Sequence, residues 1–387
     1  CKIEHFNSNY SNLPNDNNDL NAILKDNYCK SNNTSEFIEW IPYNSLIDIT
    51  FIDQGGFSKV YSALWLSNNL YEWNHADLEW KRLSGYKPVA LKVLESYYNI
   101  SEFLREVQSY YKIGFSHKIT KLYGISKDPN TQNYILVLEY VKYGSLRKFL
   151  DKHNKYLLTS YKIKILKNIA EGINEIHSKG LIHQDIHSGN ILNTDFDNIR
   201  ITDLGLSKFV DQTSNNDNNE KEKRIYGNLP YIAPEVFQGQ LYTQKADIYS
   251  FGIIINEVFT GKRPFYNMFD DELKIIIDIC KNNLRPKIYE NTPKSLIDLL
   301  NKCWNAEPSN RPTTDEIIQK LTYFEADDII FKELRNFNNE ILEQYFKSTD
   351  NKSDLKILQI SKLHSIKLVN STGTVYLVYI LLYLTYI

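Results

Sequence analysis

The sequence predicts an α+β fold of two unequal lobes, a small β-sheet lobe with one helix followed by a larger, mainly helical lobe. Apolar strand-type runs fill most of the segment up to about residue 142, one amphipathic helix interrupts them, and the segment beyond is mostly helical in pattern. We expect an N-lobe over 45–141 and a C-lobe over 142–325. A polar, partly flexible N-terminal extension (1–44) and a C-terminal tail with an apolar end (326–387) flank them.

The N-terminal extension is rich in Asn, Ser and Asp and holds few apolar residues to bury, as in SNLPNDNNDLN and KSNNTSE. Such a composition is typical of flexible or weakly structured segments. An apolar run, FIEWIP, begins at Phe37. We therefore assign no helix or strand to residues 1–36.

The N-lobe combines three strand-type runs with one helix. The runs are FIDQGGFSKVYSALW (51–65), KPVALKVL (87–94) and NYILVLEYV (133–141), and ISEFLREVQSYYKI (100–113) has the pattern of an amphipathic helix. An unusually long stretch, 68–86, separates the first two runs and carries two of the five Trp. This stretch is either a docking surface or a solvent loop that packs its Trp side chains on the N-lobe.

Helical patterning starts the C-lobe. In YKIKILKNIAEGINEIHSKG, one face carries Leu166, Ile169, Ile173 and Ile176 at three- and four-residue spacing, and Gly180 supplies a C-terminal stop. This segment predicts a long helix with one buried face.

Three further local signals mark the C-lobe. TTDEIIQKL opens with a capping box, in which Thr313 is followed three residues later by Glu316. GNILNTDFDNIRITDLG predicts a β-hairpin that turns at Asp195 to Asn198. The polar stretch 211–224 is long and charged enough for a mobile loop.

Charge and cysteine content exclude several classes of function. The formal net charge of −2 provides no basic field, so we expect no binding to nucleic acid. The four cysteines are scattered without metal-ligand spacing, which fits a reducing compartment. No cleavable signal peptide precedes the polar first residues, and the chain starts at Cys1 rather than Met, so the true N-terminus can be missing. We expect an intracellular, cytoplasmic protein.

The C-terminal tail ends in TVYLVYILLYLTYI (374–387), which is apolar throughout. As a helix this stretch would reach roughly 21 Å, short of the roughly 30 Å hydrocarbon core of a bilayer. We therefore expect no membrane span. A packed terminal strand or helix and a sequence that belongs to no fold both remain open.

Short segments stand in a fixed order along the chain. They are IDQGGFSKVY (52–61), VALKVL (89–94), HQDIHSGN (183–190), DLG (203–205), APE (233–235), DIYSFG (247–252) and NRP (310–312). Each alone is weak, because a Gly-Gly pair is more often a turn and a strand Lys is more often on the surface. At roughly one in twenty per position, eight or more specified residues in order do not arise by chance. Together they resemble the eukaryotic protein kinase family over about residues 45–325.

The resemblance implies an ATP-dependent protein kinase that transfers the γ-phosphoryl group to protein hydroxyls in intracellular signalling. ATP and Mg²⁺, or Mn²⁺, are the implied cofactors, and a protein is the implied substrate. Such a transfer needs the triphosphate held in line, its charge neutralised and the attacking hydroxyl oriented. The sequence does not indicate an oligomeric state.

The resemblance assigns the nucleotide site to the N-lobe strands and the hinge. Because strand side chains alternate between faces, Ala90 and Lys92 point the same way, one under the base and the other toward the α- and β-phosphates. Lys92 and Glu106 form the implied catalytic ion pair, with Glu102 as the weaker candidate, and Leu138 is the implied gatekeeper. The implied nucleotide contacts are Ile52, Gly55, Gly56, Phe57, Val60, Ala90, Lys92, Leu138, Glu139, Val141 and Leu192.

The catalytic loop supplies the remaining implied roles. Asp185 accepts or orients the proton of the substrate hydroxyl, and Asn190 and Asp203 hold the metal ion. The predicted hairpin explains their spacing, because folding 191–202 back on itself brings Asn190 and Asp203 to one site. His187 helps to bind the γ-phosphate if protonated, whereas a neutral imidazole would satisfy the loop by hydrogen bonding.

The later segments have structural roles in the family. They imply that Glu235 pairs with Arg311. They also imply that Asp247 braces the catalytic loop from below.

This chain departs from the family pattern in the glycine-rich loop and in the catalytic loop. The first and third glycines of the glycine-rich loop are Asp53 and Ser58, and the catalytic-loop Arg is Gln184. A carboxylate about 8 Å from a phosphate, at an effective dielectric near 20, costs on the order of 2 kcal/mol before screening. We therefore expect weakened ATP binding, and an activity that does not depend on activation-loop phosphorylation in the usual way.

The substrate hydroxyl is predicted from the same loop. His187 and Asn228 replace the serine/threonine hallmarks, but DIHSGN is also not the tyrosine-kinase loop. It is more similar to the tyrosine-kinase-like group, most of whose members act on Ser and Thr. We expect a Ser/Thr kinase, with dual specificity as the next possibility.

Two alternatives to an active kinase stay open at this point. The first is a pseudokinase, an ATP-binding scaffold with little or no turnover, and the departures at Asp53, Ser58 and Gln184 motivate it. The second is a membrane-tethered scaffold, which only the apolar tail motivates. A pseudokinase would be expected to lack Lys92, Asp185 or Asp203, and all three are present.

Overall fold

The computed structural model describes residues between 17 and 326, all within one compact unit, Cys1–Phe331. Gaps in the described residues fall at 32–35, 56–57, 67–69, 75–78, 95–99, 155–156, 158, 195–197, 211–226, 269–271 and 290–291. The polar loop 211–224 and the apolar stretch 374–387 therefore lie outside the described residues. In the part that is described, no helix has both the length and the apolar character that crossing a bilayer requires.

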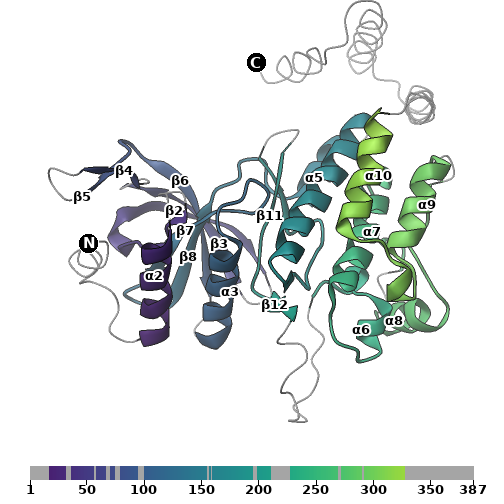
Figure 1. The fold of residues 1–387 in the computed structure, drawn as a ribbon, viewed down its shortest axis with the longest axis horizontal. Helices are drawn as coiled ribbons and strands as arrows, with labels where there is room; N and C mark the ends of the chain where they lie inside the picture. Colours follow the sequence, from purple (N-terminus) through teal and green to yellow (C-terminus); the bar gives the residue numbers. More distant parts are fainter. Residues whose placement is uncertain are drawn as a thin grey trace, which may run out of the picture. The chain divides into compact units, whose positions relative to one another are not determined.

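The N-lobe is built on a six-stranded sheet in the order β1-β7-β8-β6-β3-β2 (Figure 1). Its strands are β1 (Glu39–Trp40), β2 (Leu46–Gln54), β3 (Ser58–Trp65), β6 (Lys87–Leu94), β7 (Leu122–Lys127) and β8 (Tyr134–Glu139). All neighbours are antiparallel except β1 and β7. The core under the sheet includes Trp65, Val89, Leu91, Ile135 and Val137, and fully burying side chains of this kind stabilises the fold by roughly 2 kcal/mol each.

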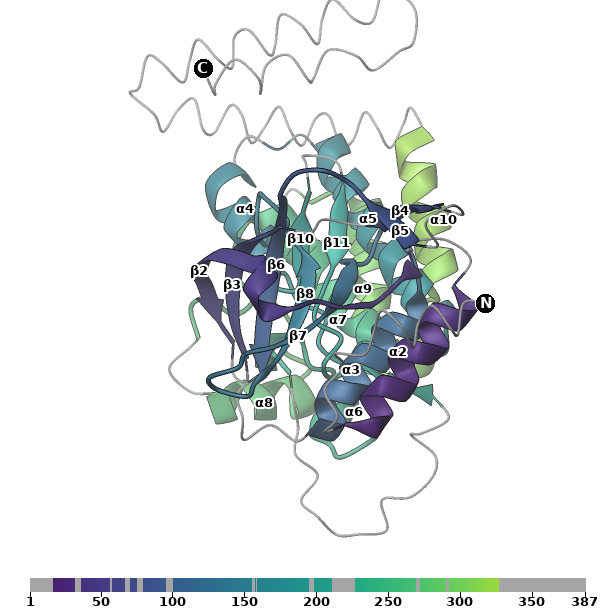
Figure 2. The ribbon, with the colours of Figure 1, turned by 90° about the vertical axis from the view of Figure 1, so that its left-hand side faces the viewer.

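Within the described residues, the N-lobe holds two helices, whereas the sequence predicts one. The predicted helix is α3 (Ile100–Ile113), and the additional one is α2 (Asn18–Lys30), in the stretch to which the sequence analysis assigns no element. Helices α2 and α3 lie side by side in both views (Figures 1 and 2). The polar composition hides α2 because only Leu20, Leu24 and Tyr28 supply buried apolar side chains.

The long stretch between β3 and β6 contains a hairpin of β4 (Leu70–Asn74) and β5 (Glu79–Arg82), which forms a two-stranded sheet of its own. Arg82 at the end of β5 donates to Glu39 on β1 at 2.6 Å and ties this hairpin to the main sheet. The stretch is therefore not a simple solvent loop, because it forms two paired strands. A role as a docking surface stays a prediction.

The C-lobe is mainly helical, and the predicted two-lobed α+β fold is confirmed. Its helices are α4 (Leu146–His153), α5 (Thr159–Ser178), α6 (Pro234–Phe237), α7 (Gln244–Thr260), α8 (Glu272–Lys281), α9 (Lys294–Cys303) and α10 (Thr314–Ala326), with 3₁₀ turns at Leu229–Tyr231 and Pro308–Asn310. In Figure 1, α5 and α10 run alongside one another and α7 lies at the centre of the lobe. Nearly all of α7 is buried, which explains why it shows little amphipathic pattern.

The local signals in the C-lobe sequence are confirmed. Thr313 and Glu316 form the reciprocal bonds of a capping box, and Gly180 adopts a left-handed φ of +71° after α5. The predicted hairpin is present as β10 (Ile191–Asn193) paired with β11 (Ile199–Ile201). A second short pair, β9 (Leu181–Ile182) and β12 (Lys208–Phe209), lies beside it in sequence.

Candidate active site

Three charged side chains from three different parts of the chain meet at one point. Lys92 on β6 places its Nζ 2.8 and 2.9 Å from the two carboxylate oxygens of Glu106 on α3, and 2.7 Å from Oδ1 of Asp203. Lys92 is 7% exposed and Glu106 is 1% exposed. A single ammonium group therefore joins the N-lobe sheet, the helix α3 and the DLG segment.

Burial and charge oppose one another in this cluster. Burial alone would lower the pKa of Lys92, but the carboxylates of Asp203 and Glu106 raise it above its ordinary value. Burial disfavours the Asp203 charge as well, yet the Lys92 ammonium lowers the pKa of Asp203. For Glu106 burial prevails, with help from Asp203, and its pKa is raised although Lys92 opposes this. Lys92 is therefore protonated and Asp203 ionised at neutral pH.

Gly205, the last residue of DLG, is required by this cluster. A β-carbon at Gly205 would lie 3.1 Å from Glu106 Oε2, 3.2 Å from Asp203 Oδ1 and 3.5 Å from Lys92 Nζ. The Gly205 N–H also donates to Asp203 Oδ1 at 3.3 Å. Asp203 itself has a φ of +64°, an uncommon value for a residue with a side chain, which directs its carboxylate toward Lys92.

The carboxylate of Asp185 is held by hydrogen bonds from two directions. Its Oδ1 accepts from the Asn228 N–H at 3.1 Å, and its Oδ2 accepts from the Asn190 side-chain amide at 3.0 Å. Burial would raise the pKa of Asp185, but the adjacent His187 holds it below its ordinary value. Asp185 is thus an ionised acceptor in a fixed orientation, as a residue that orients a hydroxyl must be.

His187 is engaged within the loop through both ring nitrogens. The Gly189 N–H donates to its Nδ1 at 3.0 Å, and its Nε2 lies 3.5 Å from Asp185 Oδ2. A β-carbon at Gly189 would lie 2.6 Å from the ring, so the ring also occupies the space beside that glycine. This hydrogen-bond pattern assigns the proton to Nε2 and matches the neutral alternative for His187.

Asn190 and Asp203 are brought together by the β10–β11 hairpin. Ile191 pairs with Ile201, and the Thr202 N–H donates to the Asn190 carbonyl at 2.9 Å, so Asp203 directly follows a residue bonded to Asn190. The Asn190 side chain donates its amide hydrogens to Asp185, which leaves its carbonyl oxygen for a ligand. An amide oxygen and a carboxylate are hard oxygen ligands that suit Mg²⁺.

No denser metal site competes with this pair in the described residues. Among them, His, Cys, Asp and Glu side chains form no cluster of three or more that could hold a metal ion. The residues present therefore fit a magnesium ion that completes its shell with phosphate oxygens and water, rather than an all-protein metal cage.

The catalytic loop is supported from below by Asp247, as expected. Its two carboxylate oxygens accept the backbone N–H groups of His183 and Gln184, each at 2.9 Å. His177 Nε2 also lies 2.8 Å from Asp247 Oδ2. Gln184 has a φ of +70°, so these bonds hold the loop in an uncommon backbone conformation.

The expected ion pair between Glu235 and Arg311 is also confirmed. The two side chains are bidentate, with N–O distances of 2.6 and 2.7 Å, and both are buried. The pair joins the start of α6 to the segment before α10.

A buried network beneath the loop was not predicted from the sequence. Glu257 on α7 accepts hydrogen bonds from Ser188 at 2.8 Å and from Tyr231 at 2.6 Å, and it forms an ion pair with Arg147 on α4. The network connects the catalytic loop to two helices. Its local signal is Glu257, a carboxylate that follows the apolar run Ile253–Ile255 in α7, because such residues are rarely buried without a partner.

The residues expected to contact the base share one face of the sheet. The strand register places Val60 opposite Lys92, and Ala90 opposite Leu138. Directly opposed residues of antiparallel strands lie on the same face, so Ala90, Lys92, Val60 and Leu138 form one surface. Leu138 and Val141 are buried, as an apolar wall requires.

The other expected nucleotide contacts lie around this surface. Leu192 is joined to the C-lobe side of the hinge by a bridge to Ser145, and Ile52 is 40% exposed on β2. The Glu139 carboxylate bonds to Arg200 at 3.1 Å, and the Glu139 backbone N–H donates to the Lys121 carbonyl at 2.8 Å. Gly55 begins the turn after β2, whereas Gly56 and Phe57 lie outside the described residues.

Asp53 is paired rather than isolated, which the sequence did not indicate. Its Oδ2 lies 2.9 Å from the Nζ of Lys148 on α4, and both side chains are about 60% exposed. The hydrogen bond from Lys148 lowers the pKa of Asp53 despite partial burial, so the carboxylate is ionised and compensated. The repulsion that we expected between Asp53 and phosphate is therefore offset in part by a cation from the other lobe.

The sequence was compared with known protein families and with curated proteins. Residues 24–321 match the family described as protein tyrosine and serine/threonine kinase. A Dictyostelium discoideum protein named "Probable serine/threonine-protein kinase" is 31% identical over 79% of this chain and 16% of its own length. A dual specificity protein kinase of the same organism is 30% identical over 81% of this chain and 21% of its own length. The chain thus spans only about a fifth of the length of these relatives.

Proposed function

Because the chain belongs to the family of protein tyrosine and serine/threonine kinases, we propose that it transfers the γ-phosphoryl group of ATP to protein hydroxyl groups. Members of this family use ATP and a divalent metal ion. The observation that carries the proposal is the convergence of Lys92, Glu106 and Asp203 within 3 Å contacts, beside an oriented Asp185. We assign this reaction to the segment 45–325.

In the proposed reaction, Lys92 holds the α- and β-phosphates, and Glu106 keeps its ammonium group in place. Asp203 and Asn190 would hold Mg²⁺, which neutralises charge on the β- and γ-phosphates when it is bound. These residues do no covalent chemistry. Their contribution is to fix the triphosphate in line and to compensate its charge, which is where most of the rate enhancement of phosphoryl transfer arises.

Asp185 acts on the attacking hydroxyl. Its ionised carboxylate accepts or orients the hydroxyl proton, and the bonds from Asn228 and Asn190 set the direction in which it can do so. His187 contributes by fixing this carboxylate, through the contact between its Nε2 and Asp185. These arrangements favour an active kinase over a pseudokinase, because each group needed for turnover is present.

We assign the chain to the tyrosine-kinase-like group and its substrate hydroxyl to Ser or Thr. The loop HQDIHSGN supports this, since it lacks the tyrosine-kinase pattern. The printed names of the relatives, serine/threonine and dual specificity kinases, are in agreement. We place the reaction in the cytoplasm, and the free thiols of Cys29, Cys280 and Cys303 are compatible with a reducing compartment.

Radiolabel transfer from [γ-³²P]ATP to a generic protein substrate tests this proposal. Lys92→Ala should lower the transfer rate by about 10² or more, because the phosphates lose the ammonium group that holds them. Lys87→Ala, on the same strand, is the matched control and should retain the wild-type rate. Acid hydrolysis of the product should yield phosphoserine and phosphothreonine. Label on phosphotyrosine alone would contradict the substrate assignment, and equal transfer by wild type and Lys92→Ala would contradict the site.

A further inference from the structure

Helix α2 is an ordered part of the N-lobe in spite of its polar sequence. Asn17 caps its N-terminus by accepting the Leu20 N–H at 2.9 Å. Leu20 and Leu24 are fully buried, and Asn27 and Tyr28 continue the same stripe at helical spacing. The helix therefore presents one face to the protein along its whole length.

The chain that follows α2 is fastened to it and to the sheet. The Asn27 side chain donates to the Glu36 carbonyl at 3.0 Å and accepts the Ile38 N–H at 2.8 Å. The rings of Tyr28 and Phe37 stack with centroids 5.0 Å apart. Residues 39–40 then join the sheet as β1. We call residues 17–31 and 36–41 the N-terminal strap.

The sheet has a specific accommodation for this strap. β1 pairs in parallel with β7, and Glu39 lies opposite Gly124. A β-carbon at Gly124 would lie 2.2 Å from the Glu39 carbonyl oxygen, so only glycine allows the two backbones to approach this closely. The strap is therefore held at its N-terminal end by the buried face of α2 and at its C-terminal end by the pairing of β1 with β7.

The strap contacts the helix that carries Glu106. The Tyr111 hydroxyl on α3 donates to Asp26 Oδ2 on α2 at 2.6 Å, and this bond is the largest cause of the lowered pKa of Asp26. Tyr111 lies five residues, less than one and a half turns, after Glu106 on α3. A shift of α3 away from α2 would therefore also displace Glu106 from Lys92.

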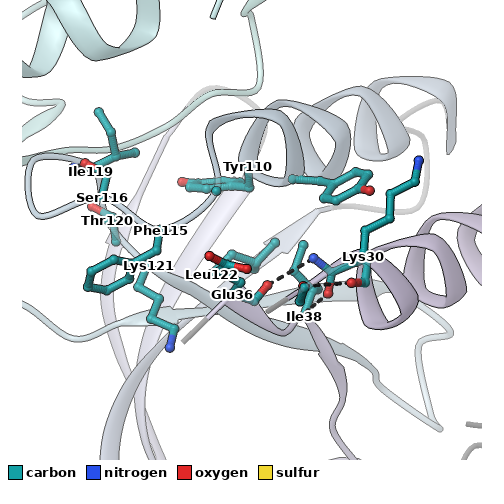
Figure 3. A pocket seen from close by; sticks show the side chains of 14 residues that line it. Lys30, Glu36, Ile38, Tyr110, Phe115, Ser116, Ile119, Thr120, Lys121 and Leu122 are labelled. Atoms are coloured by element: carbon teal, nitrogen blue, oxygen red, sulfur yellow. Dashed lines mark hydrogen bonds between the residues drawn. The ribbon is translucent and has the colours of Figure 1, made fainter. Parts of the chain in front are cut away.

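Between the strap and the last turn of α3, the packing is incomplete. A cavity of about 120 Å³ separates this turn from α2 and from residues 115–122, and its lining includes Asn27, Ile38, Tyr110 and Leu122 (Figure 3). The strap and this end of α3 therefore meet through a few specific contacts, among them the Tyr111–Asp26 hydrogen bond, rather than through continuous packing.

We propose that the N-terminal strap is a positioning element that holds α3 so that Glu106 reaches Lys92, with Asp26, Asn27 and Tyr111 as its positioning residues. This inference rests on the proposed function, because the Lys92–Glu106 pair matters only if the site binds nucleotide. None of these three residues needs to touch ATP or substrate. The strap affects the site by favouring the formation of the Lys92–Glu106 ion pair.

A double-mutant cycle in the full chain tests the strap, with the Kd for Mg·ATP and the transfer rate as readouts. Asn27→Ala opens the strap and should weaken Mg·ATP binding about tenfold, the effect of losing buried hydrogen bonds worth about 1.4 kcal/mol. Tyr111→Phe, which removes one hydroxyl, should weaken it about threefold. In the Glu106→Gln background both substitutions should change binding by less than twofold, because the ion pair through which they act is already impaired. Asn18→Ala, on the exposed face of α2, is the matched control.

The outcomes separate this inference from the proposed function. Equal loss of Mg·ATP affinity in the wild-type and Glu106→Gln backgrounds would show a general structural effect and overturn the strap as a positioning element. Should Asn27→Ala fail to fold, the Tyr111→Phe cycle decides, since its melting temperature should stay within a few degrees of wild type. If no variant transfers phosphate although Mg·ATP binds, the proposed function fails while the binding cycle still tests the strap.

Discussion

Lys92 Nζ contacts both carboxylate oxygens of Glu106, at 2.8 and 2.9 Å, although the two residues lie on different elements, the strand β6 and the helix α3. Glu106 is 1% exposed, so the pair is shielded from bulk water. This pair fixes the position of the only cation that reaches Asp203 in the described part of the chain. The proposed nucleotide site therefore depends on where α3 lies.

Glu106→Gln should lower kcat/KM for ATP by about 10- to 100-fold. The amide keeps the shape of the side chain but removes the charge that holds Lys92, so the ammonium group is left to Asp203 alone. Glu102→Gln, one turn earlier on α3, should leave kcat/KM within twofold of wild type. Steady-state kinetics of both variants provide the check, and a larger loss from Glu102→Gln would reverse the assignment of the pair.

Lys148→Ala should raise KM for ATP by about two- to fivefold. The substitution leaves Asp53 ionised without its partner, and an exposed ion pair is worth at most about 1 kcal/mol. In an Asp53→Gly background the same change should have no effect on KM. Lys152→Ala serves as the control on the same helix. An equal rise of KM in both backgrounds would show that Lys148 acts independently of Asp53.

Phosphatase treatment should leave turnover within twofold of the untreated enzyme. Gln184 cannot pair with a phosphate as the usual Arg would, and Asp247 already holds the backbone of the loop through the Gln184 N–H at 2.9 Å. The candidate acceptors Thr213, Ser214 and Tyr226 lie outside the described residues. A drop in turnover of tenfold or more after treatment would mean that another cationic side chain binds a phosphate on the activation loop.

The stability of the protein should rise with pH because of Lys162. Burial lowers the pKa of this lysine to about 7, and its Nζ has the Phe259 carbonyl as its acceptor at 3.1 Å. Unfolding restores an ordinary pKa near 10.4, so the unfolded state binds more protons between pH 7 and 10 and stability increases with pH. The contribution from pH 7 to 9 is about 2 kcal/mol.

Urea unfolding at pH 7, 8 and 9 measures this effect of Lys162. Lys162→Met should reduce the rise by about 2 kcal/mol, whereas Lys164→Met, at an exposed position of the same helix, should retain it in full. If the free energies of unfolding of wild type and Lys162→Met changed with pH in parallel, the lowered pKa of Lys162 would be disproved.

The sequence predicted those features that local patterns encode. The alternation of β6 places Ala90 and Lys92 on one face, the spacing of α3 puts Glu106 on its buried side, and the capping box at Thr313 forms as expected. The motif order also predicted the ion pair between Glu235 and Arg311. Each of these features needs only a short segment, or a family pattern, to be recognised.

The features that were missed depend on contacts between distant segments. Asp53 and Lys148 lie 95 residues apart, and nothing near either residue indicates the other. Glu257 has its partners on three other segments. Helix α2 is stabilised by the two hydrogen bonds of the Asn27 side chain. In the sequence, this asparagine cannot be told from one that lies on the protein surface. Strand β7 was also missed. Nearly all of its residues are buried, so it lacks the alternation of apolar and polar residues by which a half-exposed strand is predicted.

The most direct test of the central claim is single-turnover transfer of ³²P from Mg·[γ-³²P]ATP by wild type and by Asp185→Asn, with Mg·ATP affinity measured in parallel. Asp48→Asn, at an exposed position on β2, controls for the loss of a carboxylate. The account predicts that Asp185→Asn loses at least about 10² in transfer rate while its Mg·ATP affinity stays within a few-fold of wild type. Undiminished transfer by Asp185→Asn would contradict it.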